Sequence, residues 1–290
     1  MGNITEKSTK FPASVVNEIF SKVSGHSTLA KLAKKTPVSF SGNDIFTFNL
    51  DDEVEIVGEG KDKSPGGATI EPVSVRPVKV VYQHRMSDEF LKASEEKQLA
   101  MLGAFKDGYS IKIATGLDIM GMHGVNPRTL EASATIGENH LDTVQSTNYT
   151  EGEPEEALND AVELVGNNDI TGYALSRSMG TALGKLKVNG VPQFSEFSLG
   201  GNPGTLGRTQ ADVNSTVTKG NANAMAYVGD FKKAFVWGYA DDMTFEIIKY
   251  GDPDGQGDLK RKNQIVLRAE AYIGWGILNK DAFARIVKPA

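Results

Sequence analysis

The chain contains no cysteine, only four histidines and no apolar run long enough to cross a membrane. The absence of cysteine excludes disulfide bonds, thiolate metal sites and cysteine nucleophiles, and it is typical of a reducing compartment. Every apolar run is far shorter than the roughly 18 residues that a membrane-spanning helix needs. The first residues, Met1–Lys7, also lack the apolar core of a signal peptide. We therefore interpret the protein as cytosolic.

Signals for catalysis are equally scarce. The histidines show no HxxxH-type ligand spacing, and no serine stands in a GxSxG turn. The segment Asp252–Asp258 alternates acids with glycines as a calcium loop does, but Asn263 stands at its twelfth position, where an EF-hand needs a bidentate glutamate. The glycine-rich segment 200–204 is not followed by the Gly-Lys-Ser/Thr of a phosphate-binding loop. We expect no metal site, no cofactor, no catalytic residues and no enzyme activity.

The composition is that of a folded globular protein with an uneven distribution of charge. The 290 residues are 39% hydrophobic and 23% charged, enough for one large domain or two of about 150 residues. The net charge of −6 argues against a wholly basic face that binds nucleic acid. Residues 1–40 hold six lysines against two acids, whereas residues 41–71 hold eight acids against two lysines. Each segment alone fits a solvated surface, and the two together also fit complementary contact surfaces between subunits.

A long amphipathic helix is predicted between Met86 and Asn126, a stretch without proline. Ser87 is the expected N-cap, with Asp88 and Glu89 in the first turn, where acids complement the positive end of a helix. Apolar residues then recur at steps of three or four, along one face of a 3.6-residue period: Leu99, Leu102, Phe105, Tyr109, Ile113, Leu117 and Met120. About 30 to 35 residues give a rod of roughly 50 Å, around which we expect the other parts to be built.

A polar β-hairpin is predicted just before the helix. Residues 54–60 and 70–82 are predicted as strands, joined by the turn-forming tip Lys61–Ala68. Pro72 and Pro77 lie in the return strand, and since proline cannot donate to a β-ladder, neither belongs in a central sheet. The apolar alternation also changes phase at Pro77. A two-stranded ribbon is only marginally stable in water, so we expect it to lie on its own domain or on a neighbouring copy of the chain.

The chain on either side of these two elements predicts a mixture of helices and strands. Residues 9–33 contain one short helix and no compact core, which we interpret as an extended N-terminal arm. Residues 121–152 are predicted as loop with one strand around 141–145. The predicted elements beyond it are, in order, a helix at 154–165, a strand at 173–175, a helix at 176–187, strands at 225–231, 234–239 and 243–250, and a final hairpin of 265–274 with 283–287. The alternation of helix and strand indicates an α/β subdomain.

Four short segments stand out within this order of parts: Gly58-Glu59-Gly60 in the acidic hairpin, the junction Met86-Ser87-Asp88-Glu89-Phe90-Leu91, the strand Gly229-Asp230-Phe231 and the closing Asp281-Ala282-Phe283. With them, nearly the whole chain resembles the major capsid proteins of tailed bacteriophages with the HK97 fold. The resemblance implies an α+β fold. Its implied parts are an N-terminal arm (1–50), an extended β-hairpin or E-loop (51–84), a P-domain with the long spine helix (85–152), a central α/β A-domain (153–225), and the return of the A-domain with strands of the P-domain (226–290).

The resemblance also implies a function. We expect a structural protein that self-assembles as hexamers and pentamers into the icosahedral capsid of a tailed bacteriophage and encloses double-stranded DNA without sequence-specific binding. A portal and a separate scaffolding protein are the implied partners, the latter because no scaffold-like segment precedes the arm and Met1 looks like a natural start. Assembly is expected in the bacterial host cytoplasm, the protein is expected in the virion, and no membrane is involved. The alternatives are an encapsulin-type compartment and, outside this fold, an α/β hydrolytic enzyme.

Candidate interface residues come from the arm and the hairpin. They are charged side chains of both signs: Lys31, Lys34, Lys35, Glu59, Lys61, Asp62, Lys63, Glu71 and Arg76. Some members of the family join subunits covalently through a hairpin lysine and an asparagine, and Lys61 and Lys63 stand near the corresponding place. Because neither a partner asparagine nor an assisting acid is identifiable here, we expect non-covalent cohesion.

Overall fold

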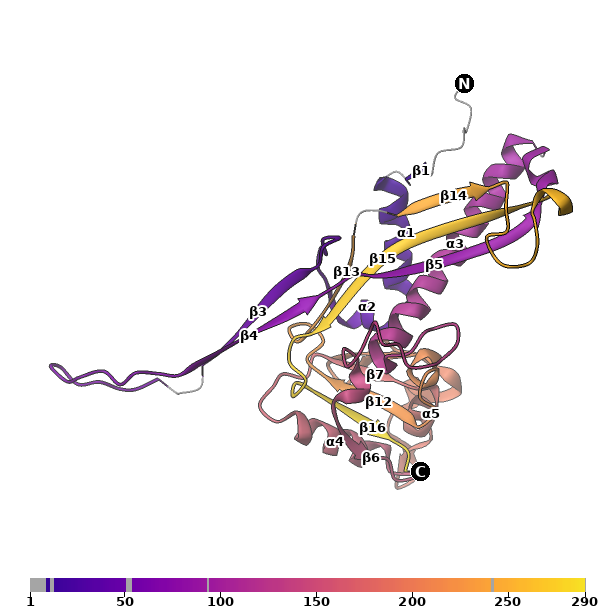
Figure 1. Ribbon diagram of the computed structural model, residues 1–290. Coiled ribbons are helices and arrows are strands. Elements are labelled where there is room, and N and C mark those ends of the chain that lie inside the picture. The colour runs from indigo at the N-terminus through magenta and orange to yellow at the C-terminus, as the bar shows by residue number, and fades with distance from the viewer. Residues whose placement is uncertain (1–8, 11–12, 51–53, 93, 241–242, 290) are drawn as a thin grey trace.

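Two sheets, a long helix and a projecting ribbon make up the computed structural model, which describes residues 9–10, 13–50, 54–92, 94–240 and 243–289. Figure 1 shows an elongated upper part, in which a sheet lies beside the long helix, and a rounded lower part around a second sheet. The ribbon leaves the junction of the two parts and extends to the left. Helices and strands are both abundant, as expected for an α+β protein.

The elongated part is a six-stranded sheet built on β15 (Gln264–Ile277), and we call it the β15 sheet. On one side β15 pairs antiparallel with β5 (Val78–Ser87). On the other side it pairs first with β14 (Thr244–Ile248) and then with β13 (Phe235–Tyr239). Two short strands complete the sheet, β1 (Thr9–Lys10) beside β14 and β2 (Lys34–Lys35) beside β13. Most residues of β15 are buried, which explains why it has few polar interruptions.

The rounded part contains a mixed sheet around β12 (Ala224–Gly229), which we call the β12 sheet. Its other strands are, in the order β10-β11-β7-β12-β16-β6, β10 (Thr205–Leu206), β11 (Thr209–Val213), β7 (Gly172–Leu175), β16 (Phe283–Val287) and β6 (Gln145–Asn148). From Ala226 to Val228 the side chains of β12 alternate between two cores. Tyr227 faces the main core, which the long helix shares, whereas Val228 faces α4 (Pro154–Val165) and α5 (Arg177–Lys185). The bounds of α4 are those predicted, with Pro154 in the first turn.

The predicted final hairpin is wrong, because β15 and β16 belong to different sheets. β16 pairs with β12 and with β6, and β15 pairs with neither. The chain leaves β15 through Leu278, whose N–H donates to the carbonyl of Ala234 at 2.7 Å, and then enters the lower sheet. Apolar content identified both strands correctly, but the apolar content of a strand does not specify which strand it pairs with.

The long helix α3 (Glu95–His123) begins seven residues later than predicted, since Ser87 ends β5 and is not its N-cap. Ser87 pairs with Gln264 of β15, and a 3-10 turn over Asp88–Lys92 follows it. Hydrogen bonds to β15 therefore override the local preference for helix at this position. Ser94 precedes the first helical residue, and the 29 residues of α3 form a rod of about 44 Å.

The predicted apolar stripe of α3 is confirmed wherever its side chains are described. Four of its residues are buried in the main core: Tyr109, Ile113, Leu117 and Met120. Leu102 and Phe105 are half-buried against β15, and the side chain of Leu99 lies outside the described part. The helix ends at Gly124, which adopts the left-handed φ of 67° that glycine tolerates best.

The prediction that the N-terminal segment has no compact core is wrong. It forms α1 (Ala13–His26) and α2 (Thr28–Leu32), and four of its apolar side chains are fully buried in the main core: Ile19, Val23, Leu29 and Leu32. An ion pair of 2.6 Å between Lys22 Nζ and Asp107 Oδ1 adds a contact between α1 and α3. Helices this short are unstable alone and depend on packing against other elements such as α3. Their short amphipathic pattern does not show in the sequence which element they pack against.

The projecting ribbon consists of β3 (Asn43–Leu50) paired antiparallel with β4 (Ala68–Val75). The predicted strand at 54–60 is wrong, since residues 54–67 form no strand and turn near Gly58, whose carbonyl accepts from the N–H of Lys61 at 3.2 Å. Glycine and proline in this segment disfavour a β-ladder, whereas the aromatic and β-branched residues of β3 favour one. The tip of the ribbon is therefore longer, and its outward strand earlier, than the sequence indicated.

The break predicted at Pro77 is confirmed. Pro77 separates β4 from β5, and there the return strand leaves its partner in the ribbon and joins β15. Residues 78–82 thus belong to the β15 sheet and not to the hairpin. Pro72 pairs with Phe46 in the ribbon, where each strand has one unpaired edge that tolerates proline.

Candidate assembly surfaces

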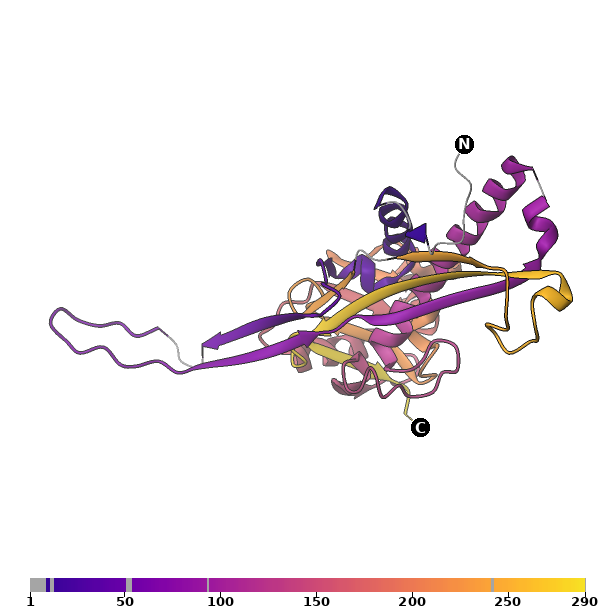
Figure 2. The same ribbon diagram turned by 45° about the horizontal axis from the view of Figure 1, so that its top comes forward.

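The ribbon of β3 and β4 is held at its base and extends far from the body, as both ribbon views show (Figures 1 and 2). Val75, the last residue of β4, is buried against the β15 sheet, where it lies close to Gly276. Next to it the Ser74 hydroxyl donates to Asp44 Oδ1 at 2.8 Å and joins the two strands. The base is therefore fixed in direction while the tip is left without support from the body.

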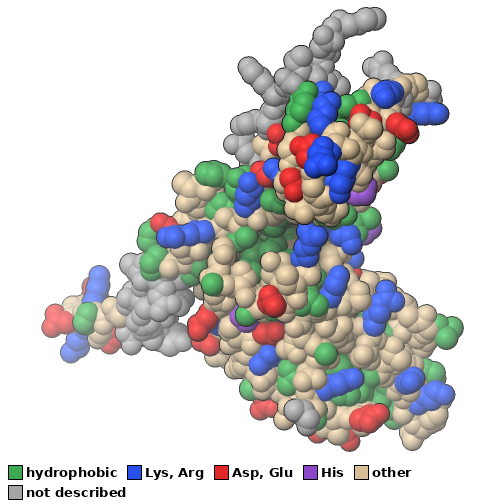
Figure 3. Space-filling view, turned by 45° about the vertical axis from the view of Figure 1, so that its right-hand side comes forward, with side chains coloured by type: hydrophobic (Ala, Val, Ile, Leu, Met, Phe, Trp, Pro, Cys, Tyr) green, Lys and Arg blue, Asp and Glu red, His purple; other side chains and the backbone are tan. Residues whose placement is uncertain are grey.

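Apolar side chains on the ribbon are exposed. Ile56 is 100% exposed and Val54 is 96% exposed in the tip, and Phe46 is 67% exposed on β3. Exposed apolar groups on a protruding element are available for contact with another molecule, and a two-stranded ribbon is marginally stable without such a contact. Figure 3 shows charged side chains of both signs around the same tip.

The predicted interface residues on the hairpin lie where a neighbouring chain can reach them. The tip residues Glu59, Lys61, Asp62 and Lys63 are all exposed, and within the described part of the chain none has an ion-pair partner. Arg76 is exposed at the base of the ribbon, beside Pro77. Glu71 lies in β4 opposite Thr47. The ribbon thus combines free charges with exposed apolar groups.

The three predicted lysines of the arm have different environments. Lys31 Nζ lies 2.6 Å from Asp212 Oδ1, and Lys35 Nζ donates to the hydroxyl of Tyr239 at 2.8 Å. Lys34 is exposed, and among the described residues it has no ion-pair partner. Lys31 and Lys35 therefore hold the N-terminal segment on the body, and only Lys34 presents an unpaired charge.

Asp118, in the last third of α3, is a buried polar residue that the sequence analysis missed. Its carboxylate accepts four hydrogen bonds, from Ser27 Oγ (2.6 Å), Thr28 N–H (3.0 Å), Leu29 N–H (3.0 Å) and Thr216 Oγ1 (2.8 Å). Burial raises the pKa of Asp118, although the four donors favour its charged form. The only signal in the sequence is a lone acid within an apolar run. This carboxylate joins α2, α3 and the loop after β11.

Asp142 is a partly buried acid that the sequence analysis also missed. Tyr227 donates its hydroxyl to Oδ1 at 2.7 Å, Oδ2 lies 3.0 Å from His123 Nδ1, and Arg285 Nη1 donates to Oδ1 at 3.2 Å. Burial raises the pKa of Asp142, but the hydrogen bonds from His123 and Tyr227 outweigh burial and hold this pKa below its usual value. His123 and Tyr227 are buried, Asp142 and Arg285 are partly buried, and the cluster joins the end of α3 to the β12 sheet.

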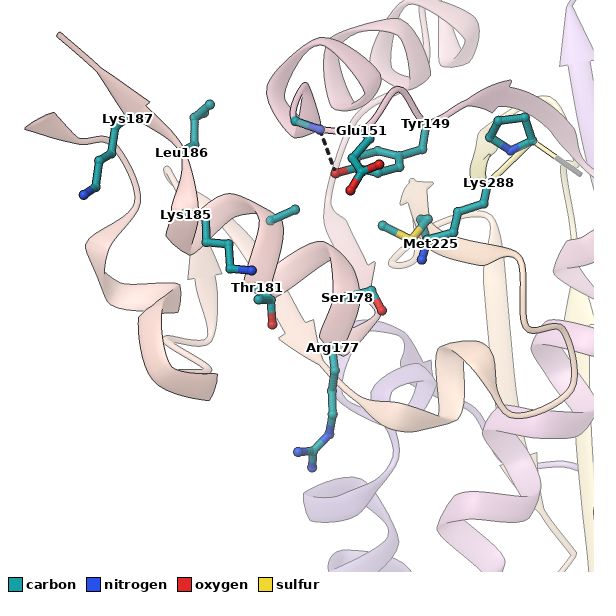
Figure 4. A pocket seen from close by; sticks show the side chains of 13 residues that line it. Tyr149, Glu151, Arg177, Ser178, Thr181, Lys185, Leu186, Lys187, Met225 and Lys288 are labelled. Carbon is teal, nitrogen blue, oxygen red and sulfur yellow. Dashed lines mark hydrogen bonds between the residues drawn. The ribbon is translucent and has the colours of Figure 1, made fainter. Parts of the chain in front are cut away.

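Three further features concern metal binding, membrane insertion and a surface groove. Among the residues that the structure describes, no three or more His, Asp or Glu side chains are grouped so that they could hold a metal ion. None of the helices in the described ranges has the length and apolar character to cross a bilayer. A groove of about 930 Å³ lies beside α5, and Figure 4 shows that its charged side chains are mainly cationic.

Comparison with known proteins identifies the family. The sequence profile described as the phage capsid family matches residues 11–288. A solved structure from Mycobacterium phage Ogopogo is 31% identical, covers 99% of this chain and 95% of its own chain, and has a TM-score of 0.77. The chain belongs to the phage capsid family.

Two further solved structures show that this capsid fold is shared beyond clear sequence similarity. A chain from Gordonia phage Cozz is 21% identical and covers 100% of this chain and 91% of its own, with a TM-score of 0.75. The capsid of an empty GTA particle is 13% identical and covers 100% of this chain and 94% of its own, with a TM-score of 0.64. No curated protein sequence matches this capsid protein. The resemblance to capsid proteins of the HK97 fold, inferred from the order of parts, is therefore confirmed.

Family membership establishes the general function. This capsid protein is a structural component of an oligomeric phage shell, and it resides in the virion. The α+β architecture described above is the architecture expected from the resemblance. Neither of the alternatives, a cargo-holding compartment and a hydrolytic enzyme, is favoured by the comparisons.

Proposed function

We propose that this capsid protein assembles as hexamers and pentamers into an icosahedral shell in which the ribbon of each copy lies on the next copy. The observation that carries the proposal is the ribbon itself, whose exposed Phe46, Val54 and Ile56 have no apolar core of their own to enter. Burial of these side chains against a neighbour stabilises both the ribbon and the contact between subunits. Each subunit of this shell contributes the implied N-terminal arm, E-loop, P-domain and A-domain.

Charged residues give this contact its orientation. Glu59, Lys61, Asp62 and Lys63 at the tip, with Glu71 and Arg76 nearer the base and Lys34 on the body, form the proposed polar interface. Lys31 and Lys35 act indirectly, by holding the N-terminal segment in place. Exposed ion pairs contribute only about 0 to 1 kcal/mol each, so apolar burial supplies most of the affinity and the charges select the register.

The proposed shell encloses double-stranded DNA without sequence-specific contacts. A net charge of −6 fits a container that does not bind its contents tightly, because tight binding to DNA depends on neutralising phosphates with lysine and arginine. A portal and a separate scaffolding protein complete the proposal, with assembly in the bacterial host cytoplasm. Contacts between different patches can close into rings or continue into tubes, so a shell of one size needs a further component that sets the curvature.

Replacement of residues 54–67 by a short Gly-Ser turn tests the proposal. These residues form no strand, so the variant is expected to keep its circular dichroism spectrum and a melting temperature within about 2 °C of the parent. Closed shells should be absent in negative-stain electron microscopy. A matched control keeps the length of the tip and neutralises only its four candidate interface charges, with Glu59→Gln, Lys61→Gln, Asp62→Asn and Lys63→Gln.

Each outcome of this experiment has a distinct meaning. Loss of shells with the turn variant but not with the neutral tip assigns the contact mainly to apolar burial. An unfolded turn variant would place the tip within the fold of its own subunit. Normal shells from the turn variant would make the ribbon dispensable. Either of the last two results contradicts the role of the ribbon between subunits.

A further inference from the structure

Charges of opposite sign are separated around α4 and α5. Residues 129–176, which include α4, contain ten acids and no lysine or arginine. Residues 177–219, which begin with α5, contain five basic residues and two acids. The reversal occurs at Ser176, between two segments that pack on one face of the β12 sheet. This separation produces one acidic and one basic surface on the same small part of the molecule.

The acidic surface is a stripe along α4. Glu156, Asp160 and Glu163 follow one another at steps of four and three residues, are exposed, and have no ion-pair partner in the described part of the chain. Like charges at these spacings repel one another. Glu163 also lies in the last turn, where a negative charge opposes the helix dipole. Within a single subunit the stripe is therefore destabilising, and a cationic surface would remove the repulsion.

The basic surface is the groove of about 930 Å³ beside α5. Four cationic residues line it: Arg177, Lys185, Lys187 and Lys288. All four are exposed, and the structure describes no ion pair for any of them. Figure 4 shows Ser178, Thr181 and Lys185 on α5 across the groove from Tyr149, Glu151 and Lys288. Apart from Glu151, the charges of the groove lining are positive.

The stripe is directed away from the body of its own subunit. The buried face of α4 holds Ala157, Leu158, Ala161 and Val165, which pack on the β12 sheet. Its contacts are with β16, β6, β12 and α5 of the same subunit, and β6 is the last strand of the sheet. The stripe on the opposite side of α4 therefore faces the surroundings of the molecule near this edge, where another subunit can approach.

We propose that the acidic stripe of α4 docks into the basic groove beside α5 of the next copy of the chain. The inference rests on the proposed function, since it names one contact through which neighbouring copies lie side by side in the shell. The two patches differ, so the contact is heterologous and closes into a ring when the rotation between copies closes. Exposed apolar side chains accompany both patches: Leu164 on α4, and Val188 and Val191 beside the groove. Charge and apolar complementarity therefore point to the same partner.

Charge reversal and its compensation in the full chain test this docking. Asp160→Lys with Glu163→Lys reverses the stripe, and Lys185→Glu with Lys187→Glu reverses the groove. We expect each pair to lower the assembled fraction, measured by sedimentation velocity and electron microscopy, by about tenfold or more. The chain with all four substitutions regains opposite signs and should assemble to within about threefold of the parent. Circular dichroism verifies that each variant is folded.

A matched control and a milder pair of variants keep the test decisive. Glu131→Lys with Asp281→Lys makes the same change in net charge as the stripe reversal, at two exposed positions outside the stripe, and it should assemble like the parent. Glu163→Gln and Lys187→Gln each remove a single charge and should lower the assembled fraction by a smaller factor. These two variants keep the test valid if a charge reversal disturbs folding.

The possible results separate this inference from the proposed function. Normal assembly of both reversal pairs, or no recovery in the fourfold variant while the control assembles, would overturn the docking and leave the shell function intact. Failure of the parent chain to form any shell or ring with its assembly partners would instead contradict the proposed function.

Discussion

Asp118 Oδ1 accepts a hydrogen bond of 2.6 Å from Ser27 Oγ, and this bond joins the long helix α3 to the N-cap of α2. The same hydroxyl oxygen accepts from the N–H of Ala30 at 3.0 Å, as an N-cap does. Asp212 holds the same helix from another direction, through the hydroxyl of Thr28 at 2.5 Å and through Lys31. A five-residue helix has little stability of its own, so these two carboxylates fix its position.

Asp118→Asn should therefore destabilise the subunit strongly. The amide replaces one acceptor oxygen by a donor that faces other donors, and unsatisfied buried groups cost about 1 to 3 kcal/mol. Urea unfolding of the unassembled subunit measures the difference in the free energy of unfolding. Asp107→Asn, which breaks an exposed ion pair with Lys22, is the control and should cost about 1 kcal/mol or less. Equal losses in the two variants would show that the Asp118 hydrogen bonds contribute little.

The subunit should become less stable as the pH decreases below neutrality, because of His140. Burial lowers the pKa of His140 below its usual 6.5. Below 6.5 the unfolded chain binds a proton that the folded state does not, so stability is fully present above this pH and is lost as the pH falls toward the lower pKa of the folded state. His140→Gln should flatten the dependence of melting temperature on pH in this window. A pH dependence that is unchanged in His140→Gln would contradict this role of His140.

Two glycine substitutions should change stability in opposite directions. A Cβ at Gly238 in β13 would overlap the carbonyl oxygen of Thr36, so Gly238→Ala should cost about 1 to 3 kcal/mol. Gly103 lies within α3 with open space around it, and Gly103→Ala should stabilise the subunit by up to about 1 kcal/mol. Thermal unfolding of both variants provides the comparison. A stabilising Gly238→Ala would mean that β2 is not held against β13 in solution.

Shells should come apart into single chains when boiled in detergent. The chain has no cysteine, and the hairpin lysines Lys61 and Lys63 have no described asparagine or acid partner. Denaturing electrophoresis of purified shells should show one band at 31.2 kDa. A ladder of larger bands would reveal covalent bonds between subunits, and replacement of Lys61 and Lys63 by arginine would then test which lysine forms them.

Elements with strong local signals were predictable from the sequence. Pro154 at the start of α4 and Gly166 after its end determine the bounds of that helix through backbone geometry alone. The phase change at Pro77 marks the junction of ribbon and sheet for a similar reason, since proline cannot continue a ladder. In both cases the determining interactions lie within a few residues of the element.

Elements that depend on distant partners were not predictable. Ser87 is a good N-cap in isolation, yet it extends β5 because Gln264 pairs with it. The strand of the ribbon is β3 and not the segment at 54–60, although both contain suitable residues, because only β3 lies opposite β4. Asp118 was not recognised as a site residue because its donors Ser27 and Thr216 are far from it on either side in the sequence.

The sequence by itself determined the absence of thiol chemistry, the segregation of charge, the apolar stripe of α3 and the order of parts that identifies the family. Only the tertiary structure decided which strands share a sheet, which lysines are already paired and which charges remain free for another subunit. The physical reason is the range of the interactions involved. Backbone preferences and helical periodicity act between near neighbours, whereas strand pairing, burial and ion pairs depend on residues that only the folded chain brings together.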